Sequence, residues 1–81
     1  MIKVKAHGSL ITALGKAEFE INEDGIKVKK ILNIITSSSG YKPSPLLMLI
    51  LVNGVEISAL DQEDTVVKSG DKVVLIPIHG G

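Results

Sequence analysis

The chain ends in Ile78-His79-Gly80-Gly81, two glycines and a carboxylate that directly follow an apolar run. Glycine has no Cβ, so this backbone can pass through a narrow channel that larger side chains would block. The four residues after Pro77, fully extended, span roughly 13–14 Å. That length reaches into another protein's active site while the domain stays outside. A glycine pair by itself is more typical of a frayed terminus, so the functional interpretation depends on the rest of the chain.

One glycine-containing stretch superficially matches a phosphate-binding loop. Gly8 is followed by Gly15-Lys16, but six residues separate the two glycines where the motif has four. Ala17 also stands where the motif needs Ser or Thr to bind magnesium. We therefore expect no nucleotide site here.

The residue types that commonly bind metals do not form a metal-site pattern in this sequence. His7 and His79 are far apart in the sequence, with no partner at ligand spacing. The acidic residues Asp61, Glu63 and Asp64 lack the glycine pattern of a calcium loop and predict a solvated surface loop. The chain has no Cys, so it offers neither a thiol nucleophile nor a thiolate ligand. We expect no metal site and no catalytic centre of its own.

Composition narrows the class of protein further. Nine lysines balance nine acidic residues, there is no Arg, and Phe19 and Tyr41 are the only aromatic residues, which argues against direct nucleic-acid binding. The longest apolar run, 46–52, is far shorter than the ~18 residues that span a bilayer. The N-terminus lacks the apolar core of a signal peptide. These features indicate a cytoplasmic protein with no membrane partner.

Two early segments, 2–6 and 17–21, alternate apolar and charged residues with the two-residue period of a half-buried strand. If they pair as a hairpin, the lysines of the first and the glutamates of the second share the solvated face, where opposite charges stabilise the pair. The stretch between them, 7–16, is too long for a tight turn.

A helix is expected next, because apolar residues recur at i, i+3, i+4 and i+7. These residues are Val28, Ile31, Leu32 and Ile35. Asn22 or Asp24 is expected to cap its start, and Gly40 to end it in the left-handed conformation.

The second half of the chain predicts three strands. Residues 46–52 are continuously apolar, as in a central strand. Asn53-Gly54 is a strong two-residue hairpin signal that leads into a short strand at 55–57. A turn at 69–71 then opens the last strand, 72–78.

The order strand, strand, helix, strand, short strand, strand predicts an α+β fold. The helix can cover one sheet face if the first and last strands lie parallel at the centre with the hairpins outside. That arrangement is a β-grasp, a mixed sheet of four to five strands with one main helix packed on one face. The pattern alone also allows a ferredoxin-like or other α+β sandwich. We expect a single domain at 1–78 and a flexible tail at 79–81.

The last twelve residues, from Gly70-Asp71 to Gly80-Gly81, resemble the terminus of the small ubiquitin-like sulfur carriers and modifiers. Val52-Asn53-Gly54 and Leu14-Gly15 also stand where that family has them. The similarity spans essentially the whole chain. It is closest to the MoaD-type small subunit of molybdopterin synthase and the small archaeal modifier proteins. ThiS carriers and the ubiquitin-related modifier are more distant.

The resemblance implies a specific chemistry at Gly81. In the family, an activating enzyme of the ubiquitin-activating, MoeB or ThiF type uses ATP to adenylate the terminal carboxylate. This carboxylate, with a pKa of roughly 3.3–3.7, is ionised at neutral pH and resists nucleophiles until it gains a leaving group. Sulfur transfer then gives a thiocarboxylate, or a lysine takes the acyl group as an isopeptide. The chain is thus expected to be a co-substrate rather than an enzyme, with no permanently bound cofactor.

The same resemblance assigns roles to the residues around that terminus. Gly80 would keep the approach to the carbonyl unobstructed. The partner's channel would be lined by Ile76, Pro77, Ile78 and His79.

The last strand is apolar in both side-chain parities, although one helix can bury only one of them. Lys72 indicates that its own parity, with Val74 and Ile76, faces away from the helix. By analogy with the sheet-surface patch of ubiquitin, Leu49 and Leu51 would join these two in a docking surface. The alternative is that a connector or loop covers them.

Three fates of the activated terminus remain open: sulfur for the molybdenum cofactor, sulfur for tRNA thiolation, or conjugation to lysines. The partners would be a sulfur donor, lysine-bearing target proteins, or the large subunit of molybdopterin synthase. MoaD-type proteins usually have an aromatic-rich first strand followed by an Arg, and this chain has neither. This difference favours a modifier that also carries sulfur. A different class, a β-grasp interaction module with an idle tail, remains the alternative.

Overall fold

The computed structural model describes residues 1–44 and 47–78. The elements run in the order β1 (Ile2–Ala6), α1 (Ser9–Leu14), β2 (Glu18–Ile21), β3 (Ile26–Lys27), α2 (Val28–Ser39), β4 (Met48–Val52), β5 (Val55–Glu56), the short 3₁₀ helices η2 (Ile57–Ala59) and η3 (Gln62–Asp64), β6 (Val66–Val67) and β7 (Lys72–Pro77).

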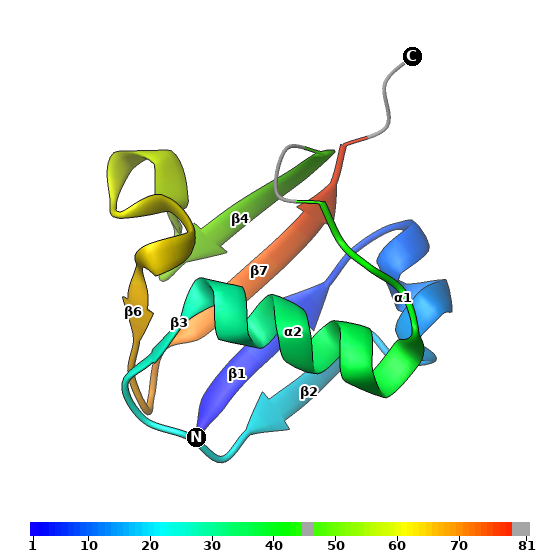
Figure 1. Ribbon diagram of the computed structural model, residues 1–81, viewed down its shortest axis with the longest axis horizontal. Coiled ribbons are helices and arrows are strands. Elements are labelled where there is room, and N and C mark those ends of the chain that lie inside the picture. The colour runs from blue at the N-terminus through cyan, green and yellow to red at the C-terminus, as the bar shows by residue number, and fades with distance from the viewer. Residues whose placement is uncertain (45–46, 79–81) are drawn as a thin grey trace.

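Five of the strands form one mixed sheet in the order β2-β1-β7-β4-β5. The first and last strands lie side by side and parallel at its centre, with Val4 opposite Val73, and the other pairings are antiparallel. The main helix α2 crosses one face of this sheet (Figure 1). The arrangement confirms the β-grasp prediction and excludes the ferredoxin-like alternative.

The β1–β2 hairpin has the charge pairing that the sequence predicts. Lys3 lies opposite Glu20 and Lys5 opposite Glu18, while the apolar residues between them point toward α2. Strand β2 starts at Glu18, one residue later than expected. Ala17 contributes to the pairing with β1 only through its carbonyl, which accepts a hydrogen bond from the Ala6 N–H.

The core lies between the sheet and α2. The predicted apolar stripe of the helix is buried throughout, and it packs on the inward side chains of the central strands. The fully buried members from the sheet are Ile2, Val4, Ile50, Val73 and Leu75. Each such side chain contributes about 1.5–3 kcal/mol by leaving water.

The stretch 7–16 contains a helix, α1, that the sequence analysis did not predict. Its six residues are too few to show a helical period, but they bury Leu10 completely at one end of the core. Gly8 and Gly15 flank it with positive φ angles of 58° and 76°, and the Gly15 N–H donates to the Ile11 carbonyl at 2.8 Å. This helix closes the end of the core that α2 leaves open.

The predicted cap of α2 is wrong. Neither Asn22 nor Asp24 caps it, because the helix begins at Val28 after an extended Lys27. Strands β3 and β6 pair beside this start, and the Val28 N–H donates to the backbone carbonyl of Thr65 at 2.9 Å. A backbone acceptor from a distant loop thus replaces the side-chain cap. Asp24 instead accepts a 2.8 Å hydrogen bond from the Ser69 N–H.

The predicted left-handed end of α2 and the predicted Asn53-Gly54 hairpin turn are both confirmed. Gly40 follows α2 with φ 75°, and its N–H donates to the Thr36 carbonyl at 2.9 Å. Asn53 and Gly54, with φ 51° and 83°, make the turn between β4 and β5 in the conformation that a two-residue hairpin needs. Of the predicted strand 46–52, residue 46 lies outside the described residues and β4 starts at Met48.

Other boundaries differ from the predictions by a residue. β5 ends at Glu56 because Ile57 begins η2, and the acidic loop 61–64 contains η3. β7 ends at Pro77, one residue before the predicted end. Within residues 1–44 and 47–78, no helix combines the length and apolar character needed to cross a membrane.

Candidate functional site

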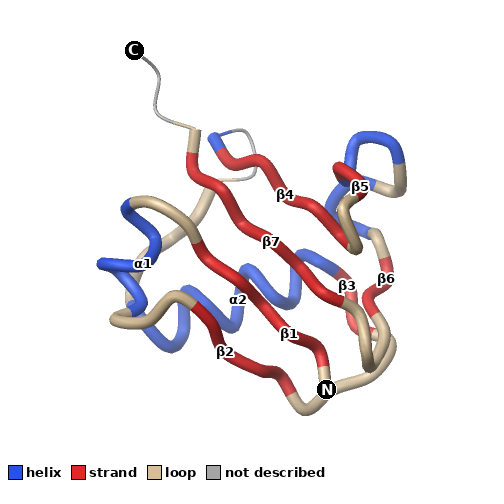
Figure 2. Tube along the Cα trace, turned by 180° about the vertical axis from the view of Figure 1, so that it is seen from behind, coloured by secondary structure: helices blue, strands red, loops and turns tan. Residues whose placement is uncertain are grey.

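The sheet face opposite α2 carries an apolar patch on the neighbouring strands β4 and β7. In the antiparallel register Leu49 lies opposite Ile76, and Leu51 lies opposite Val74. All four are half-buried, whereas the residues between them face the core and are buried. We refer to Leu49, Leu51, Val74 and Ile76 as the apolar patch. The strands carrying it face the viewer in Figure 2, with α2 behind them.

The patch exists because β7 is apolar in both parities while only one side of the sheet has a helix. Val73 and Leu75 point to the core, so Val74 and Ile76 must point to the other side. Charged residues border the patch on both flanks. Lys5 pairs with Val74 across β1 and β7, and Glu56 pairs with Leu51 across β4 and β5. The surface is therefore apolar at its centre with both charge signs at its rim, as in many protein interfaces.

The apolar surface continues along β7 to the last described residue. The Ile78 N–H donates to the Leu47 carbonyl at 2.8 Å, and these two side chains are 53% and 62% exposed. Pro77, opposite Met48, is half-buried. The predicted site residues His79, Gly80 and Gly81 lie outside the described residues. Leu47 was not among the predicted residues, although it shares the parity of Leu49 and Leu51 in an apolar run.

The base of β7 is held by a polar clamp of Asn53, Lys68 and Asp71. Asp71 accepts hydrogen bonds from the Lys68 N–H at 2.8 Å and from the Asn53 side-chain amide at 3.0 Å. These two bonds, the Lys68 bond with the larger effect, hold the pKa of Asp71 below its usual value. The Asn53 side-chain oxygen also accepts from the Lys72 N–H at 2.9 Å. The clamp fixes where the strand that carries the patch begins.

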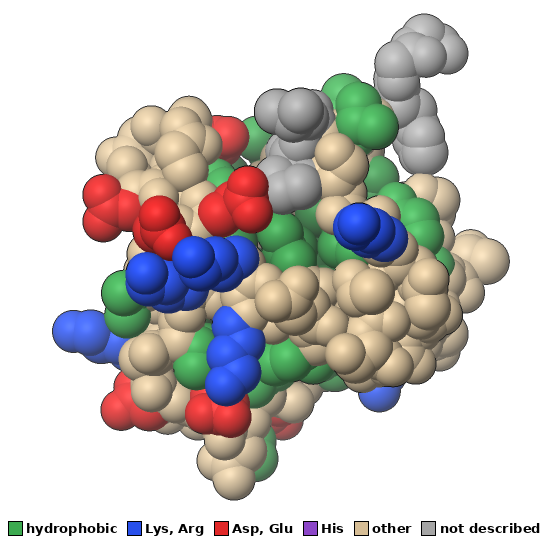
Figure 3. Space-filling model, in the orientation of Figure 1, with side chains coloured by type: hydrophobic (Ala, Val, Ile, Leu, Met, Phe, Trp, Pro, Cys, Tyr) green, Lys and Arg blue, Asp and Glu red, His purple; other side chains and the backbone are tan. Residues whose placement is uncertain are grey.

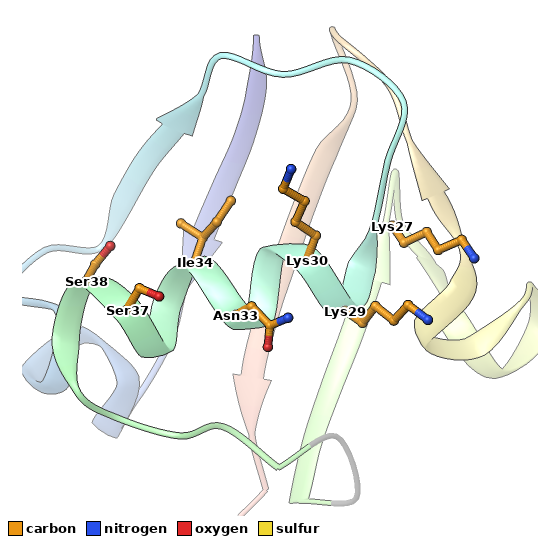
Figure 4. Close-up of a pocket in the computed structure, with 7 residues that line it drawn as sticks. All are labelled: Lys27, Lys29, Lys30, Asn33, Ile34, Ser37 and Ser38. Atoms are coloured by element: carbon orange, nitrogen blue, oxygen red, sulfur yellow. The ribbon is translucent and has the colours of Figure 1, made fainter.

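A second surface feature lies over α2, on the side of the molecule away from the patch. It is a hollow of about 560 Å³, shown in Figure 4, and its lining consists of Lys27, Lys29, Lys30, Asn33, Ile34, Ser37 and Ser38.

Two lysines of this hollow are paired with the acidic loop. Lys29 Nζ lies 3.1 Å and Lys27 Nζ 3.5 Å from the same Asp64 carboxylate oxygen, which lowers the pKa of Asp64, through the Lys29 hydrogen bond first. Acidic and basic side chains meet on this side of the molecule in Figure 3. The residues that line this hollow and Asp64 beside it do not provide a nucleophile with an adjacent base. Among residues 1–44 and 47–78, no three His, Cys, Asp or Glu side chains gather as metal ligands would.

The fold is that of the small ubiquitin-like β-grasp proteins, and the sequence places the chain in their sulfur carrier and modifier family. The sequence profile of the ThiS family matches residues 4–81, and the chain belongs to that family. By sequence, no curated protein matches it.

Solved structures of the same fold cover nearly the whole chain. The small archaeal modifier protein 1 of Methanosarcina acetivorans is 24% identical with a TM-score of 0.80, over 99% of this chain and 94% of that one. Urm1 of Sulfolobus solfataricus is 25% identical with a TM-score of 0.67, over 94% and 99%. A chain of the BexX/CysO complex of Amycolatopsis orientalis is 19% identical with a TM-score of 0.80, over 100% and 99%.

Proposed function

We propose that the chain is a ubiquitin-like protein modifier and sulfur carrier whose Gly81 carboxylate is adenylated by an ATP-dependent activating enzyme. The observation that carries the proposal is the ThiS-family match, because it extends over residues 4–81 and so includes both the folded body and the glycine pair. The likeness to archaeal modifier protein 1 and to Urm1 supports the same class. The protein itself supplies no catalytic group.

The chemistry follows from the ionised carboxylate. Its oxygen attacks the α-phosphate of ATP, pyrophosphate leaves, and the carbonyl of Gly81 becomes an acyl-adenylate. A sulfide-level sulfur nucleophile can then displace AMP to give a thiocarboxylate. A lysine amine of a target protein can instead take the acyl group, which gives an isopeptide. In both routes the activating enzyme, of the ubiquitin-activating, MoeB or ThiF type, supplies the catalysis and uses the ATP.

Body and tail have separate roles in this proposal. The apolar patch docks on the activating enzyme, with its charged rim setting orientation. Ile76, at the end of the patch, lies at the mouth of the partner's channel, Pro77 to His79 enter it, and Gly80 leaves room for the adenylating groups around the carbonyl.

The decisive experiment combines the purified chain, ATP and its cognate activating enzyme, and follows the acyl-adenylate or enzyme thioester by intact mass spectrometry. The wild-type chain is expected to react, Gly81→Ala to react more slowly, and a chain without Gly80 and Gly81 not at all. Glu63→Gln, in the exposed loop, is the matched control and should react like the wild type. Equal turnover by the truncated chain would refute the proposal.

Mass spectrometry of protein from the native host distinguishes sulfur transfer from conjugation to lysines as the fate of the activated terminus. Sulfur in place of oxygen at the terminus identifies a carrier, and Gly-Gly remnants on lysines of other proteins identify a modifier. A stable complex with the large subunit of molybdopterin synthase would identify the MoaD-type alternative. Partner binding that survives loss of the glycine pair, with no activation of the intact chain, would identify an interaction module with an idle tail.

A further inference from the structure

Strand β2 is an edge of the five-stranded sheet. Within residues 1–44 and 47–78, β1 is the only strand that pairs with it. The Ala6 N–H donates to the Ala17 carbonyl at 2.7 Å, and bonded pairs recur every second residue in an antiparallel ladder. This period directs the backbone N–H and C=O groups of Glu18 and Glu20 away from β1. The edge therefore offers donors and acceptors to another extended segment.

Beside this edge, between β2 and α2, lies a hollow of about 390 Å³. Its apolar floor consists of the half-buried Leu14, Phe19 and Ile34, which pack against the core. Ile34 and Lys30 project from the same side of α2 in Figure 4. A strand added to β2 would turn every second side chain toward this floor, so apolar side chains at those positions would leave water.

The other face of the edge has the opposite character. Glu18 and Glu20 are exposed there, and on the inner side they face Lys5 and Lys3 of β1. An added strand would meet the same two carboxylates from the outer side. Lysine or arginine at the alternate positions would complement them, as the lysines of β1 already do.

A second copy of this chain fits the edge poorly. If two β2 edges paired antiparallel with both α2 helices on one side of the joined sheet, Glu18 of one copy would face Glu20 of the other. Like charges directly opposite destabilise a strand pair. The edge is thus charged against self-association and complementary to a basic strand.

We propose that the β2 edge binds an extended segment of a partner protein as a sixth strand, in which apolar residues alternate with Lys or Arg. The apolar residues face Phe19 and Ile34, and the cations face Glu18 and Glu20. β1 lies between this edge and the apolar patch on β4 and β7. A partner can therefore hold the body at β2 while the opposite half of the sheet is engaged elsewhere.

The test uses the full chain, labelled with ¹⁵N, and a short synthetic peptide in which Val alternates with Lys. Two matched peptides carry Glu in place of Lys, or the Lys sequence with backbone N-methyl groups on the edge-facing residues. The Lys peptide is expected to shift the amide signals of Glu18, Glu20 and Ile34. The Glu peptide should bind at least about tenfold more weakly, since two or more cross-strand charge pairs reverse sign. The N-methylated peptide should not bind.

The variant Glu18→Gln/Glu20→Gln separates charge from fold, because it keeps the strand's shape and removes both carboxylates. It should bind the Lys and Glu peptides with similar affinity, and Glu63→Gln should behave like the wild type. The proposal fails if the N-methylated peptide binds equally well, if the wild type does not prefer the Lys peptide, or if the shifts fall on β4 and β7 instead. It also fails if β2 signals shift on self-association of the chain alone.

Discussion

Asp71 shows how a single side chain sets the start of the strand that carries the candidate site. It joins two turns that are far apart in the sequence, through the Lys68 N–H on one side and the Asn53 amide on the other. The sequence predicts each turn from its own residues, since Asn53-Gly54 and Gly70 both favour positive φ. It does not predict the link between them, because nothing local indicates that residues 18 apart meet.

The lowered pKa of Asp71 predicts an acid-sensitive contribution to stability. A carboxyl group whose folded-state pKa lies below its unfolded value stabilises the fold above the unfolded pKa of about 3.9, and this contribution is lost as pH falls through the lower, folded-state pKa. Asp71→Asn should cost about 0.5–1 kcal/mol at pH 7, a low value because the group is largely solvated. Urea unfolding at pH 7 and at pH 2–3 should show a smaller acid loss for the variant. An identical acid loss would contradict the assignment, and Asp61→Asn serves as the exposed control.

Gly40 gives a second prediction at this scale. A Cβ placed there would meet no atom within 4 Å, so the cost of a substitution comes from its φ of 75° alone. Gly40→Ala should lower the free energy of unfolding by about 1 kcal/mol. Gly40→Asn should cost less, because Asn tolerates the left-handed region. Denaturant unfolding of both variants checks this order, and equal costs would contradict it.

Among the elements, α1 carries more stability than its length suggests. Leu10 is completely buried, whereas Ile11, the next residue, is 38% exposed. Leu10→Ala should therefore cost about 2–5 kcal/mol, and Ile11→Ala about 1 kcal/mol or less. Thermal or denaturant unfolding measures both. Similar small costs for the two would mean that α1 does not close the core.

The elements predicted from the sequence are those that show a period, form a continuous apolar run or follow a clear turn signal. Strand 2–6 and the apolar stripe of α2 could be predicted because apolar residues recur along them at the period of a strand and of a helix. The two-residue strands β3 and β6 and the six-residue α1 are too short for any pattern. The start of α2 was mispredicted for a different reason. The N–H of its first residue is capped by the backbone carbonyl of Thr65. Every residue has such a carbonyl, so the sequence does not indicate which one acts as the cap.

For the molecule as a whole, the proposed division between docking body and reacting tail is testable by kinetics. Leu49→Ser, in the apolar patch, should raise the KM of the activating enzyme for the chain about tenfold or more. It should change kcat little, because the substitution weakens docking of the body and leaves the reacting terminus unchanged. Val66→Ser is the control, since Val66 is 49% exposed on β6, outside the patch. Steady-state kinetics with the chain as the varied substrate decide it. Unchanged KM for Leu49→Ser would remove the patch from the docking surface.

The candidate site was only partly predictable because it depends on contacts between distant strands. Lys72 was enough to predict which parity of the last strand faces away from the helix. The register that sets Leu49 against Ile76 and Leu51 against Val74 follows from strand pairing, which no local sequence signal encodes. The free edge at β2 was not foreseen for the same reason, since the strand order of a sheet belongs to the assembled fold.

The parallel pairing of β1 and β7 separates the ends of the folded body. Both strands run the same way, so Met1 lies at one end of the sheet and Ile78 at the other (Figure 1). A fluorophore or affinity handle fused ahead of Met1 is therefore held at the end of the sheet remote from Ile78. Such fusions give a practical route to tracking this protein in cells, whereas a handle placed behind Gly81 would occupy the carboxylate that the proposed adenylation requires.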